Sequence, residues 1–276
     1  MTILITGATG NVGRHLVTDL LDRGASLRAL SRLGAAAGLP DSVPVVEGDL
    51  ASAPDTTFAG VDAIFLFPAA TGVDAFVERA VSAGVTRFVV MSSLAVSERN
   101  ARDAESATHN HHRAVEQAVT SRTTDVTILR PGNFATNLLF WAFPIRSGYP
   151  VRIPYPTSSQ VLTHEADVAR AAAITLTESG HAGRIYEMTG PESLTKLDQL
   201  AAISTAIGTE LSALEITPED FRVDMAQFMP ADIVDMLLRY WSETVAEPEL
   251  PLEPVLGIEP TSLHQWALDH RADFAG

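Results

Sequence analysis

Three glycines near the start of the chain have the spacing of a turn that binds a pyrophosphate. Gly7, Gly10 and Gly13 form the pattern G-x-x-G-x-x-G, after an apolar run at 3–5 and before an amphipathic segment at 11–23. Glycines let backbone N–H groups approach a phosphate, and the N-terminus of the following helix adds a partial positive charge. This order of strand, turn and helix predicts a dinucleotide site. We place its contacts on Gly7, Thr9, Gly10, Asn11, Val12 and Gly13.

The side chain that follows the second strand decides which dinucleotide is expected. An Asp or Glu about 20 residues beyond the glycines would bind a ribose 2′-hydroxyl and repel a 2′-phosphate. Here the apolar run at 27–30 ends in Ser31 and Arg32, with no carboxylate. Arginine makes charge-assisted and bidentate contacts to phosphate, although a solvated surface arginine is the alternative. We therefore expect NADP(H) rather than NAD(H), held by Ser31 and Arg32.

The first half of the chain alternates strand and helix patterns that would position these residues. Further apolar runs lie at 43–47, 63–67, 87–91 and 126–129, and helical spacing at 74–83 and 112–119. Connections of this length allow crossovers between parallel strands, with helices covering both faces. The sequence predicts an α/β fold, a Rossmann-type doubly wound parallel sheet with a small C-terminal substrate-binding lobe.

The second half is less regular. We expect helices at 164–176, 197–207 and 263–270, a strand at 184–188 and a poorly structured connector at 247–260. Segment 225–241 carries methionines and aromatic residues at helical spacing, which fits either an ordinary amphipathic helix or a lid over an apolar substrate. We treat 1–276 as a single NAD(P)-binding domain. Residues from about 1 to 133 would mainly bind nucleotide, and those from about 134 to 276 would mainly form the substrate lobe, interleaved with the sheet.

Bulk composition excludes several classes of function. The 276 residues carry a net charge of −15, from 34 acidic and 19 basic side chains, and such a surface repels nucleic-acid phosphates. There is no cysteine, which excludes disulfides, thiolate catalysis and cysteine-ligated zinc. No run approaches the roughly 18 apolar residues of a membrane span, and a strand pattern begins at once. We expect a cytoplasmic protein that acts on a small molecule.

Several segments together resemble one protein family, the extended and atypical short-chain dehydrogenases/reductases, in particular their NmrA-like, NAD(P)H-binding branch. The resemblance implies a Rossmann-type sheet with a small C-terminal lobe, and either an NAD(P)-linked reaction or NAD(P)-dependent regulation. The matching segments follow the family order and span nearly the whole chain. They are 6–13 (TGATGNVG), 48–50 (GDL), 91–93 (MSS), 115–117 (VEQ), 129–134 (LRPGNF), 167–169 (DVA) and 189–191 (TGP).

The resemblance also implies further contacts. Asp49 and Leu50 would bracket the adenine ring, and 67–69 would pass beside the ribose and nicotinamide. A parallel sheet binds ligands beyond the carboxyl ends of its strands, which agrees with these positions. Asn133 would line the substrate site, with helix capping by asparagine as the alternative. The complete expected set adds Phe67, Pro68, Ala69, Ser92 and Pro131 for the cofactor, and Asn133, Phe134, Asn137, Phe228 and Trp241 for the substrate.

The catalytic positions depart from the family pattern. Standard members use a serine after the fifth strand and Tyr-x-x-x-Lys on the next helix. Ser93 matches the serine, but Thr108 stands at the tyrosine position and His112 at the lysine position. An alcohol such as Thr108 is far too weak an acid to replace tyrosine. His112 could donate a proton or hold the ribose, water or the substrate could supply the proton, or the site could be inactive.

A metal site at the histidines 109, 111 and 112 is not expected, because no nearby carboxylate completes a set of ligands. Three functional hypotheses remain. The first is an NADP(H)-dependent reductase of a carbonyl, quinone or conjugated group on an apolar, aromatic or polyketide-like small molecule. The second is a non-catalytic NADP(H) sensor that binds another protein. The third, a nucleotide-sugar epimerase or dehydratase, needs an efficient base that the sequence lacks.

Overall fold

The protein is described by a computed structural model that covers residues 1–104 and 106–275. Its chain forms two compact units, each built from three segments. Unit 1 contains Met1–Gly132, Glu165–Met188 and Pro254–Glu259. Unit 2 contains Asn133–His164, Thr189–Glu253 and Pro260–Gly276. The chain therefore leaves the first unit and returns to it twice.

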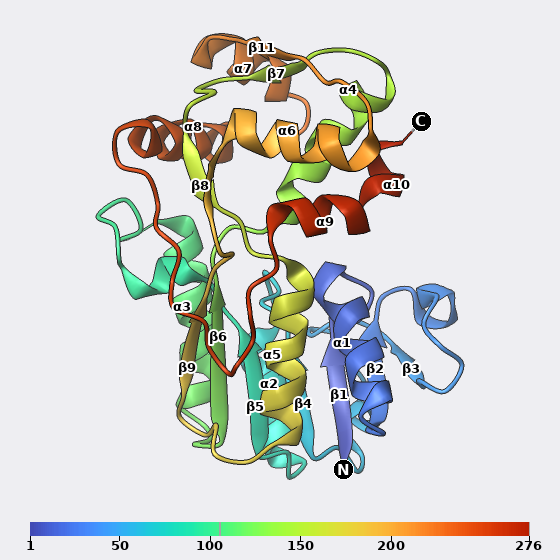
Figure 1. Ribbon diagram of the computed structural model, residues 1–276. Helices are drawn as coiled ribbons and strands as arrows, with labels where there is room; N and C mark the ends of the chain where they lie inside the picture. Colours follow the sequence, from blue (N-terminus) through green and yellow to red (C-terminus); the bar gives the residue numbers. More distant parts are fainter. Residues whose placement is uncertain (105, 276) are drawn as a thin grey trace. The chain divides into compact units, whose positions relative to one another are not determined.

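Unit 1 is built on a seven-stranded, wholly parallel sheet in the order β3-β2-β1-β4-β5-β6-β9 (Figure 1). This confirms the doubly wound sheet that the sequence predicts. The direction of winding reverses between β1 and β4, which is where such sheets bind ligands. The strands are β1 (Thr2–Thr6), β2 (Ser26–Ser31), β3 (Val45–Glu47), β4 (Ala63–Leu66), β5 (Arg87–Met91), β6 (Val126–Pro131) and β9 (Ile185–Met188).

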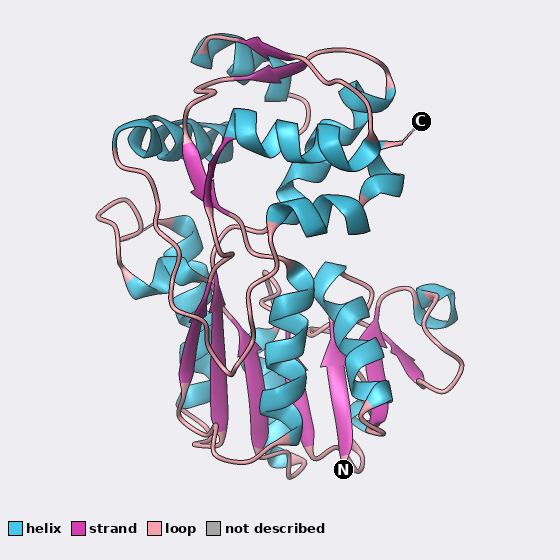
Figure 2. Ribbon diagram, in the orientation of Figure 1, coloured by secondary structure: helices cyan, strands magenta, loops and turns pink. Residues whose placement is uncertain are grey.

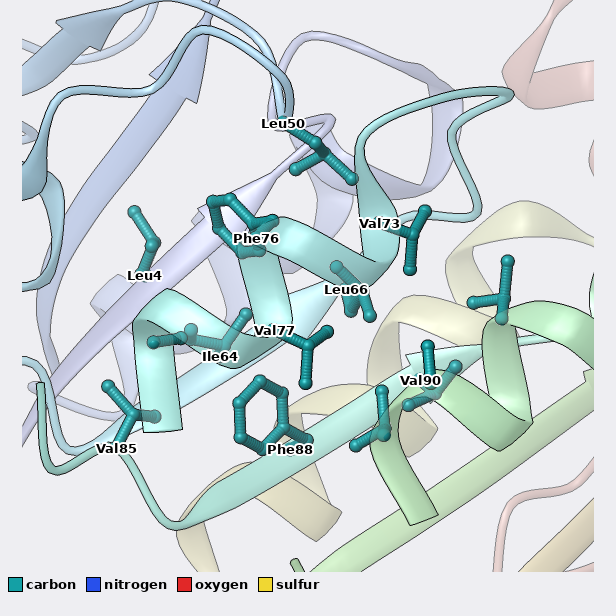
Figure 3. Packing of buried hydrophobic residues seen from close by; sticks show 14 of the residues in the cluster. Leu4, Leu50, Ile64, Leu66, Val73, Phe76, Val77, Val85, Phe88 and Val90 are labelled. Atoms are coloured by element: carbon teal, nitrogen blue, oxygen red, sulfur yellow. The ribbon is translucent and has the colours of Figure 1, made fainter. Parts of the chain in front are cut away.

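Helices cover both faces of this sheet. α1 (Asn11–Asp22) and α5 (Glu165–Thr177) pack together on one face, and α2 (Val73–Ser82) and α3 (Ala107–Thr120) cover the other (Figure 1). Because both faces are buried, the central strands read as continuous apolar runs. Figure 3 shows Phe76 of α2 packed among side chains of β1, β4 and β5. Short 3₁₀ helices lie at Gly34–Ala37, Asp55–Phe58 and Leu94–Ser97.

Unit 2 is mainly helical, with two small sheets (Figure 2). β8 (Ser159–Val161) pairs antiparallel with β10 (Ser193–Thr195), and β7 (Val151–Ile153) pairs parallel with β11 (Ala213–Glu215). One core surrounds Trp266, and a second contains Phe221 and Leu238. The helices are the 3₁₀ helix Ala135–Trp141, α4 (Ala142–Arg146), α6 (Lys196–Ile207), α7 (Pro218–Met225), α8 (Ala231–Ala246), α9 (Leu263–Asp269) and α10 (Arg271–Phe274).

The helical pattern at 225–241 is not one helix, so that expectation is wrong in its boundaries. α7 ends at Met225, and α8 begins only at Ala231, after Pro230. Proline lacks a backbone donor and disfavours a helical conformation in the residue before it, so the helix cannot run through this position. The methionines and aromatic residues of the pattern are therefore shared between two helices and the turn that joins them.

The helix expected at 112–119 begins five residues earlier, at Ala107. Ser106 caps it, because the serine hydroxyl accepts a hydrogen bond from the backbone N–H of His109 (3.0 Å). Thr108 and His112 are therefore one turn apart on the same helix. In unit 2, Thr195 and Thr217 form capping boxes with Asp198 and Asp220 at the starts of α6 and α7.

Among the described residues, no helix is both long and apolar enough to cross a membrane.

Candidate active site

The glycine turn of unit 1 packs directly against the start of α1. The Gly10 N–H donates to the Gly7 carbonyl (3.0 Å), and Gly7 has a φ of +68°, in the left-handed region that favours glycine. A Cβ at Gly13 would lie 2.1 Å from the Gly7 oxygen, so no side chain fits there. Gly10 caps α1 without a side-chain hydrogen bond, and the first turn holds no acidic residue. This helix N-terminus is therefore suited to an anion such as pyrophosphate.

The end of β4 closes one side of the turn. The Thr6 hydroxyl donates to the Phe65 carbonyl (3.0 Å) and accepts from the Phe67 N–H (2.8 Å), which ties the ends of β1 and β4 together. The Phe67 side chain lies against Gly7, where an added Cβ would meet it at 3.0 Å. Phe67 is 41% exposed, so one face of the ring is open to a ligand at the point where the winding of the sheet reverses.

The end of β2 presents one exposed cation. Ser31 is buried, and its hydroxyl accepts from the Leu33 N–H (3.2 Å), which leaves the neighbouring Arg32 exposed. Arg32 is close enough to Asp49 to contribute to lowering the pKa of that carboxyl group, although the main cause is a hydrogen bond from Ser52. Arg32 thus follows the end of β2, the strand that pairs with β1 just before the glycine turn.

Asp49 and Leu50 follow β3 and have different roles. The Asp49 carboxylate accepts hydrogen bonds from the N–H groups of Ala51 (3.0 Å) and Ser52 (2.8 Å), and so shapes the turn. Leu50 is buried and packs in the core of unit 1 with Phe76 (Figure 3). The side chains of both residues are thus engaged in the protein itself, Leu50 in the core of unit 1 and Asp49 in its own turn.

Two adjacent histidines lie on α3. His111 Nε2 is 3.0 Å from the Pro68 carbonyl oxygen, which fixes the helix to the segment after β4. The His112 ring lies 5.2 Å from that of His111, and its Nδ1 is buried without a hydrogen-bond partner in the described part of the chain. Burial, with a contribution from His111, lowers the pKa of His112 to about 4. At neutral pH His112 is therefore an uncharged imidazole that can hydrogen-bond but is a poor acid.

A buried ion pair lies beneath this helix. Arg130 of β6 donates two hydrogen bonds to the Glu116 carboxylate of α3, at 2.9 and 2.8 Å, and the Ser92 hydroxyl donates a third at 2.6 Å. The hydrogen bond to Glu116 raises the pKa of Arg130 further above its usual value. The resemblance covered both segments, but the ion pair itself could not be recognised, because nothing in either segment shows that they meet.

The other residues at the positions of the family's catalytic side chains also lie in unit 1. The Ser93 hydroxyl oxygen accepts from the Ala95 N–H (3.3 Å) and caps a 3₁₀ helix. Thr108 lies one turn before His112 on α3. Pro131 ends β6 and is buried. Together, the glycine turn and the ends of β2, β4, β5 and β6 bring every expected cofactor contact into one unit.

The expected substrate residues lie in unit 2. The Asn133 side-chain amide donates to the hydroxyl of Tyr240 on α8 (2.8 Å), rather than capping the next helix. Phe134 is the N-cap of the following 3₁₀ helix and makes no side-chain capping bond, and Asn137 is exposed on that helix. Tyr240 was not expected from the sequence, because its partner lies 107 residues away.

Two edge-to-face aromatic pairs in unit 2 involve α8 or the turn before it. Phe228, 62% exposed, meets Phe140 edge to face with ring centroids 6.0 Å apart. Trp241 packs edge to face on Phe221 at 5.2 Å, and Lys196 Nζ lies 3.0 Å from the Trp241 ring centroid. Of the expected substrate residues on this part of unit 2, Phe228 is thus open to solvent and Trp241 packs within the unit.

Within the described residues, no group of three or more His, Cys, Asp or Glu side chains could hold a metal ion.

Comparison with known proteins agrees with this geometry. Residues 7–179 match the family model described as NAD(P)H-binding. The chain is 32% identical over 283 residues to a (4-alkanoyl-5-oxo-2,5-dihydrofuran-3-yl)methyl phosphate reductase from Streptomyces griseus subsp. griseus, covering 99% of both chains. It is 29% identical to an NAD(P)H azoreductase from Xenophilus azovorans, covering 85% of this chain and 84% of the relative.

Solved structures share the fold at low sequence identity. Citrobacter sp. triphenylmethane reductase, complexed with NADP(H), matches with a TM-score of 0.80 and 20% identity, over 98% of this chain and 100% of that chain. The NADPH-dependent quinone oxidoreductase QOR2 from Escherichia coli matches with a TM-score of 0.74 and 22% identity, over 96% and 98%.

The family resemblance seen in the sequence is thus confirmed over most of the chain. The glycine turn, the uncapped start of α1 and the parallel sheet supply the matching nucleotide site. This chain belongs to the NAD(P)H-binding family of atypical, NmrA-like short-chain dehydrogenases/reductases, and it is an NAD(P)H-dependent oxidoreductase.

Proposed function

We propose that the protein is an NADPH-dependent reductase of a carbonyl, quinone or conjugated group on an apolar small molecule. The observation that carries the proposal is the combination of an uncapped α1 N-terminus with an exposed arginine, and no carboxylate, at the end of β2. A reductase that uses NADPH needs a site for both the pyrophosphate and the 2′-phosphate, and these two features supply one each.

The preference for NADPH over NADH rests on Arg32. A guanidinium group forms a bidentate contact to a phosphate, whereas the 2′-hydroxyl of NADH would gain only a weak hydrogen bond. The nearby Asp49 carboxylate accepts three hydrogen bonds from Ala51 and Ser52, which hold it in its own turn.

The apolar substrate class rests on the exposed aromatic pair of unit 2, Phe140 and Phe228. Exposed aromatic rings of this kind are typical of sites that bind flat or apolar ligands. The relatives are named as reductases of a furanone phosphate, of azo compounds and of quinones, all of which are unsaturated acceptors. Asn133, Phe134, Asn137, Phe228 and Trp241 are the residues that we assign to the substrate.

The bound cofactor would supply a hydride from its nicotinamide ring. On the protein side, the Ser93 hydroxyl would donate a hydrogen bond to the substrate oxygen. His112, uncharged at neutral pH, would hold the ribose by a hydrogen bond rather than act as an acid. Thr108 would be a further hydrogen-bonding group on the same helix. Much of the rate would come from holding the reacting carbon in place. The reaction, which we place in the cytoplasm, needs a small molecule and no macromolecular partner.

Two measurements test this function. Fluorescence titration with NADPH and NADH measures binding, and NADPH oxidation is then followed against enones, quinones and aromatic ketones. We expect tighter binding of NADPH and turnover with at least one conjugated acceptor. Tight NADPH binding with no turnover on any acceptor would contradict the proposal and would favour a nucleotide sensor instead.

A further inference from the structure

Arg14, near the start of α1, is a basic side chain that the site described above does not use. Its backbone N–H donates to the Gly10 carbonyl (3.0 Å), which places it at the end of the first helical turn. Side chains on a helix point back toward its N-terminus, so that of Arg14 extends toward the glycine turn. Arg14 Nε donates to the Thr9 carbonyl (3.0 Å), between Gly7 and Gly10. The side chain is therefore attached to the turn that we assign to the cofactor.

The hydrogen bond to Thr9 orients the guanidinium group of Arg14. A guanidinium group presents its N–H donors in a planar fork, and the bond to Thr9 uses the donor on Nε. Within the described residues, no hydrogen bond or ion pair engages the two terminal nitrogens, and Arg14 is exposed. A fork that the protein already orients loses less conformational entropy when it binds a phosphate.

The charge of Arg14 is not neutralised by the part of the chain that the structure describes. Other arginines of unit 1 pair with carboxylates, as Arg23, Arg79 and Arg122 do. Arg14 forms no such pair among the described residues, and the first turn of α1 holds no acidic residue. The whole chain has a net charge of −15, so it repels an anionic dinucleotide at long range. An unpaired guanidinium group at the glycine turn supplies local attraction.

Arg14 shares one face of α1 with the first residue of the helix. Asn11 and Arg14 are three positions apart and both exposed, whereas Val12 and Gly13 between them are buried against the rest of unit 1. The first N–H groups of a helix have no partner inside the helix and bind anions, with help from the partial positive charge of the helix end. The full charge of Arg14 adds to that partial charge on the exposed side of the turn.

We propose that Arg14 is a second phosphate-binding cation of the cofactor site, in addition to Arg32. Its Nε holds the Thr9 carbonyl, and its terminal N–H groups donate charge-assisted hydrogen bonds to phosphate oxygens of the dinucleotide. This assignment rests on the NADP(H) site of the proposed function and is independent of the substrate class. NADPH offers phosphate at two places, the pyrophosphate that NADH also carries and the 2′-phosphate that NADH lacks.

The test measures the dissociation constants of NADPH and NADH by fluorescence titration at several salt concentrations. Loss of the charged hydrogen bonds in Arg14→Ala should weaken NADPH binding by about 10-fold or more. Added salt should then weaken binding less steeply than in the wild type, because screening acts on the charge that the variant lacks. Arg14→Lys keeps the charge without the planar fork and should recover part of the affinity. The control, Arg23→Ala at the other end of α1, should bind as the wild type does.

The two nucleotides identify the phosphate that Arg14 binds. Equal losses for NADPH and NADH place Arg14 on the pyrophosphate, which is the result we expect, and a loss confined to NADPH places it on the 2′-phosphate.

Two results for Arg14→Ala would overturn the inference and leave the reductase function standing. One is unchanged affinity for both nucleotides. The other is weaker binding with the salt dependence of the wild type, because Arg14 would then only support the turn through the Thr9 carbonyl. If the wild type binds neither nucleotide, both proposals are wrong. Should Arg14→Ala not fold, Arg14→Gln replaces it, since the amide retains an N–H donor but carries no charge.

Discussion

Lys196 is the only lysine in the sequence, and unit 2 buries it almost completely. Its Nζ donates to the Pro154 carbonyl (3.2 Å) and lies over the Trp241 ring, and no carboxylate in the described part of the chain forms an ion pair with it. Burial disfavours the charged form, which lowers the pKa of Lys196 to about 6 from an ordinary value of 10.5. At neutral pH and above, this side chain is therefore mainly an uncharged amine.

This burial predicts a pH-dependent stability. Between pH 6 and 10.5 the unfolded chain binds the lysine proton and the folded chain does not, so the free energy of unfolding contributed by this group rises with pH. We expect Lys196→Met to be more stable than the wild type, with a larger gain at pH 6 than at pH 9. Urea unfolding of the variant and the wild type at pH 6 and at pH 9 measures the gain in unfolding free energy at each pH. Arg239→Met, at a 70% exposed cation on α8, is the control and should show no such pH-dependent gain.

Arg32 gives a prediction about cofactor selectivity. Loss of a charge-assisted contact to the 2′-phosphate should weaken NADPH binding by about 10- to 100-fold, because such hydrogen bonds contribute about 1.5–3 kcal/mol. Binding of NADH should hardly change in Arg32→Ala. Fluorescence titration with each nucleotide measures the dissociation constants of NADPH and NADH, and hence their ratio. Arg122→Ala, which removes a surface cation paired with Asp74, is the control. Equal losses for the two nucleotides in Arg32→Ala would show that Arg32 does not bind the 2′-phosphate.

At the scale of elements, the ion pair of Glu116 and Arg130 joins α3 to β6. Both side chains are nearly buried, at 7% and 10% exposed, and Ser92 adds a hydrogen bond from the end of β5. The Glu116 carboxylate thus joins α3 to β6 and to the residue that follows β5. Loss of the Glu116 charge leaves Arg130 nearly buried with Glu187, at 3.9 Å, as its remaining carboxylate neighbour, and breaking a buried pair from one side costs far more than the pair itself contributes.

We therefore expect Glu116→Gln to lose about 3–5 kcal/mol of unfolding free energy. Urea unfolding monitored by circular dichroism measures the loss. Asp55→Asn, which breaks the exposed pair with Arg79 in the same unit, should cost less than about 1 kcal/mol. Similar losses in the two variants would mean that the Glu116 carboxylate is not buried in the folded protein.

The sequence predicts the elements of unit 1 well because their signals are local. Strand runs and the glycine turn each depend on residues within a few positions of one another. Segment 225–241 shows where this fails, because its helical spacing continues across Pro230 and conceals the end of one helix and the start of another. The short strands of unit 2 carry three residues each, too few to form a recognisable pattern.

The residues of the proposed site also fall into two groups, those that a local sequence pattern indicates and those that only the structure shows. Gly7, Gly13 and Arg32 could be proposed from the sequence because each position follows from one continuous strand–turn–helix–strand segment. The hydrogen bond between Asn133 and Tyr240 spans 107 residues, and the ion pair of Glu116 and Arg130 joins a helix to a strand. Contacts of this kind depend on tertiary packing, which no local pattern encodes.

At the scale of the whole molecule, unit 1 is completed by two later segments of the chain, Glu165–Met188 and Pro254–Glu259. α5 and β9 belong to Glu165–Met188, after an excursion of 32 residues through Asn133–His164. α5 is buried along α1 and the central strands, with Val168, Ala172 and Leu176 fully inaccessible. A chain that stops at Gly132 would expose the apolar surface that these residues cover.

We expect the fragment 1–132 to show no cooperative unfolding transition and no NADPH binding. A chain in which a short glycine–serine linker replaces 133–164 and which ends at residue 188 restores α5 and β9, and it should recover a cooperative transition. Thermal unfolding and fluorescence titration compare the two chains. A cooperative transition in the fragment 1–132 would show that α5 and β9 are dispensable for the sheet.

The late arrival of β9 also has a consequence during synthesis on the ribosome. Domains generally begin to fold from the N-terminus as the chain emerges, so β1 to β6 are made before their last neighbour exists. Until Ile185–Met188 follows, β6 is an edge strand of the apolar sequence VTILRP, with backbone groups that β9 will later pair. Such an edge is open to pairing with a second nascent chain. The period between translation of residues 131 and 188 is therefore when this protein is most exposed to aggregation and to chaperone binding.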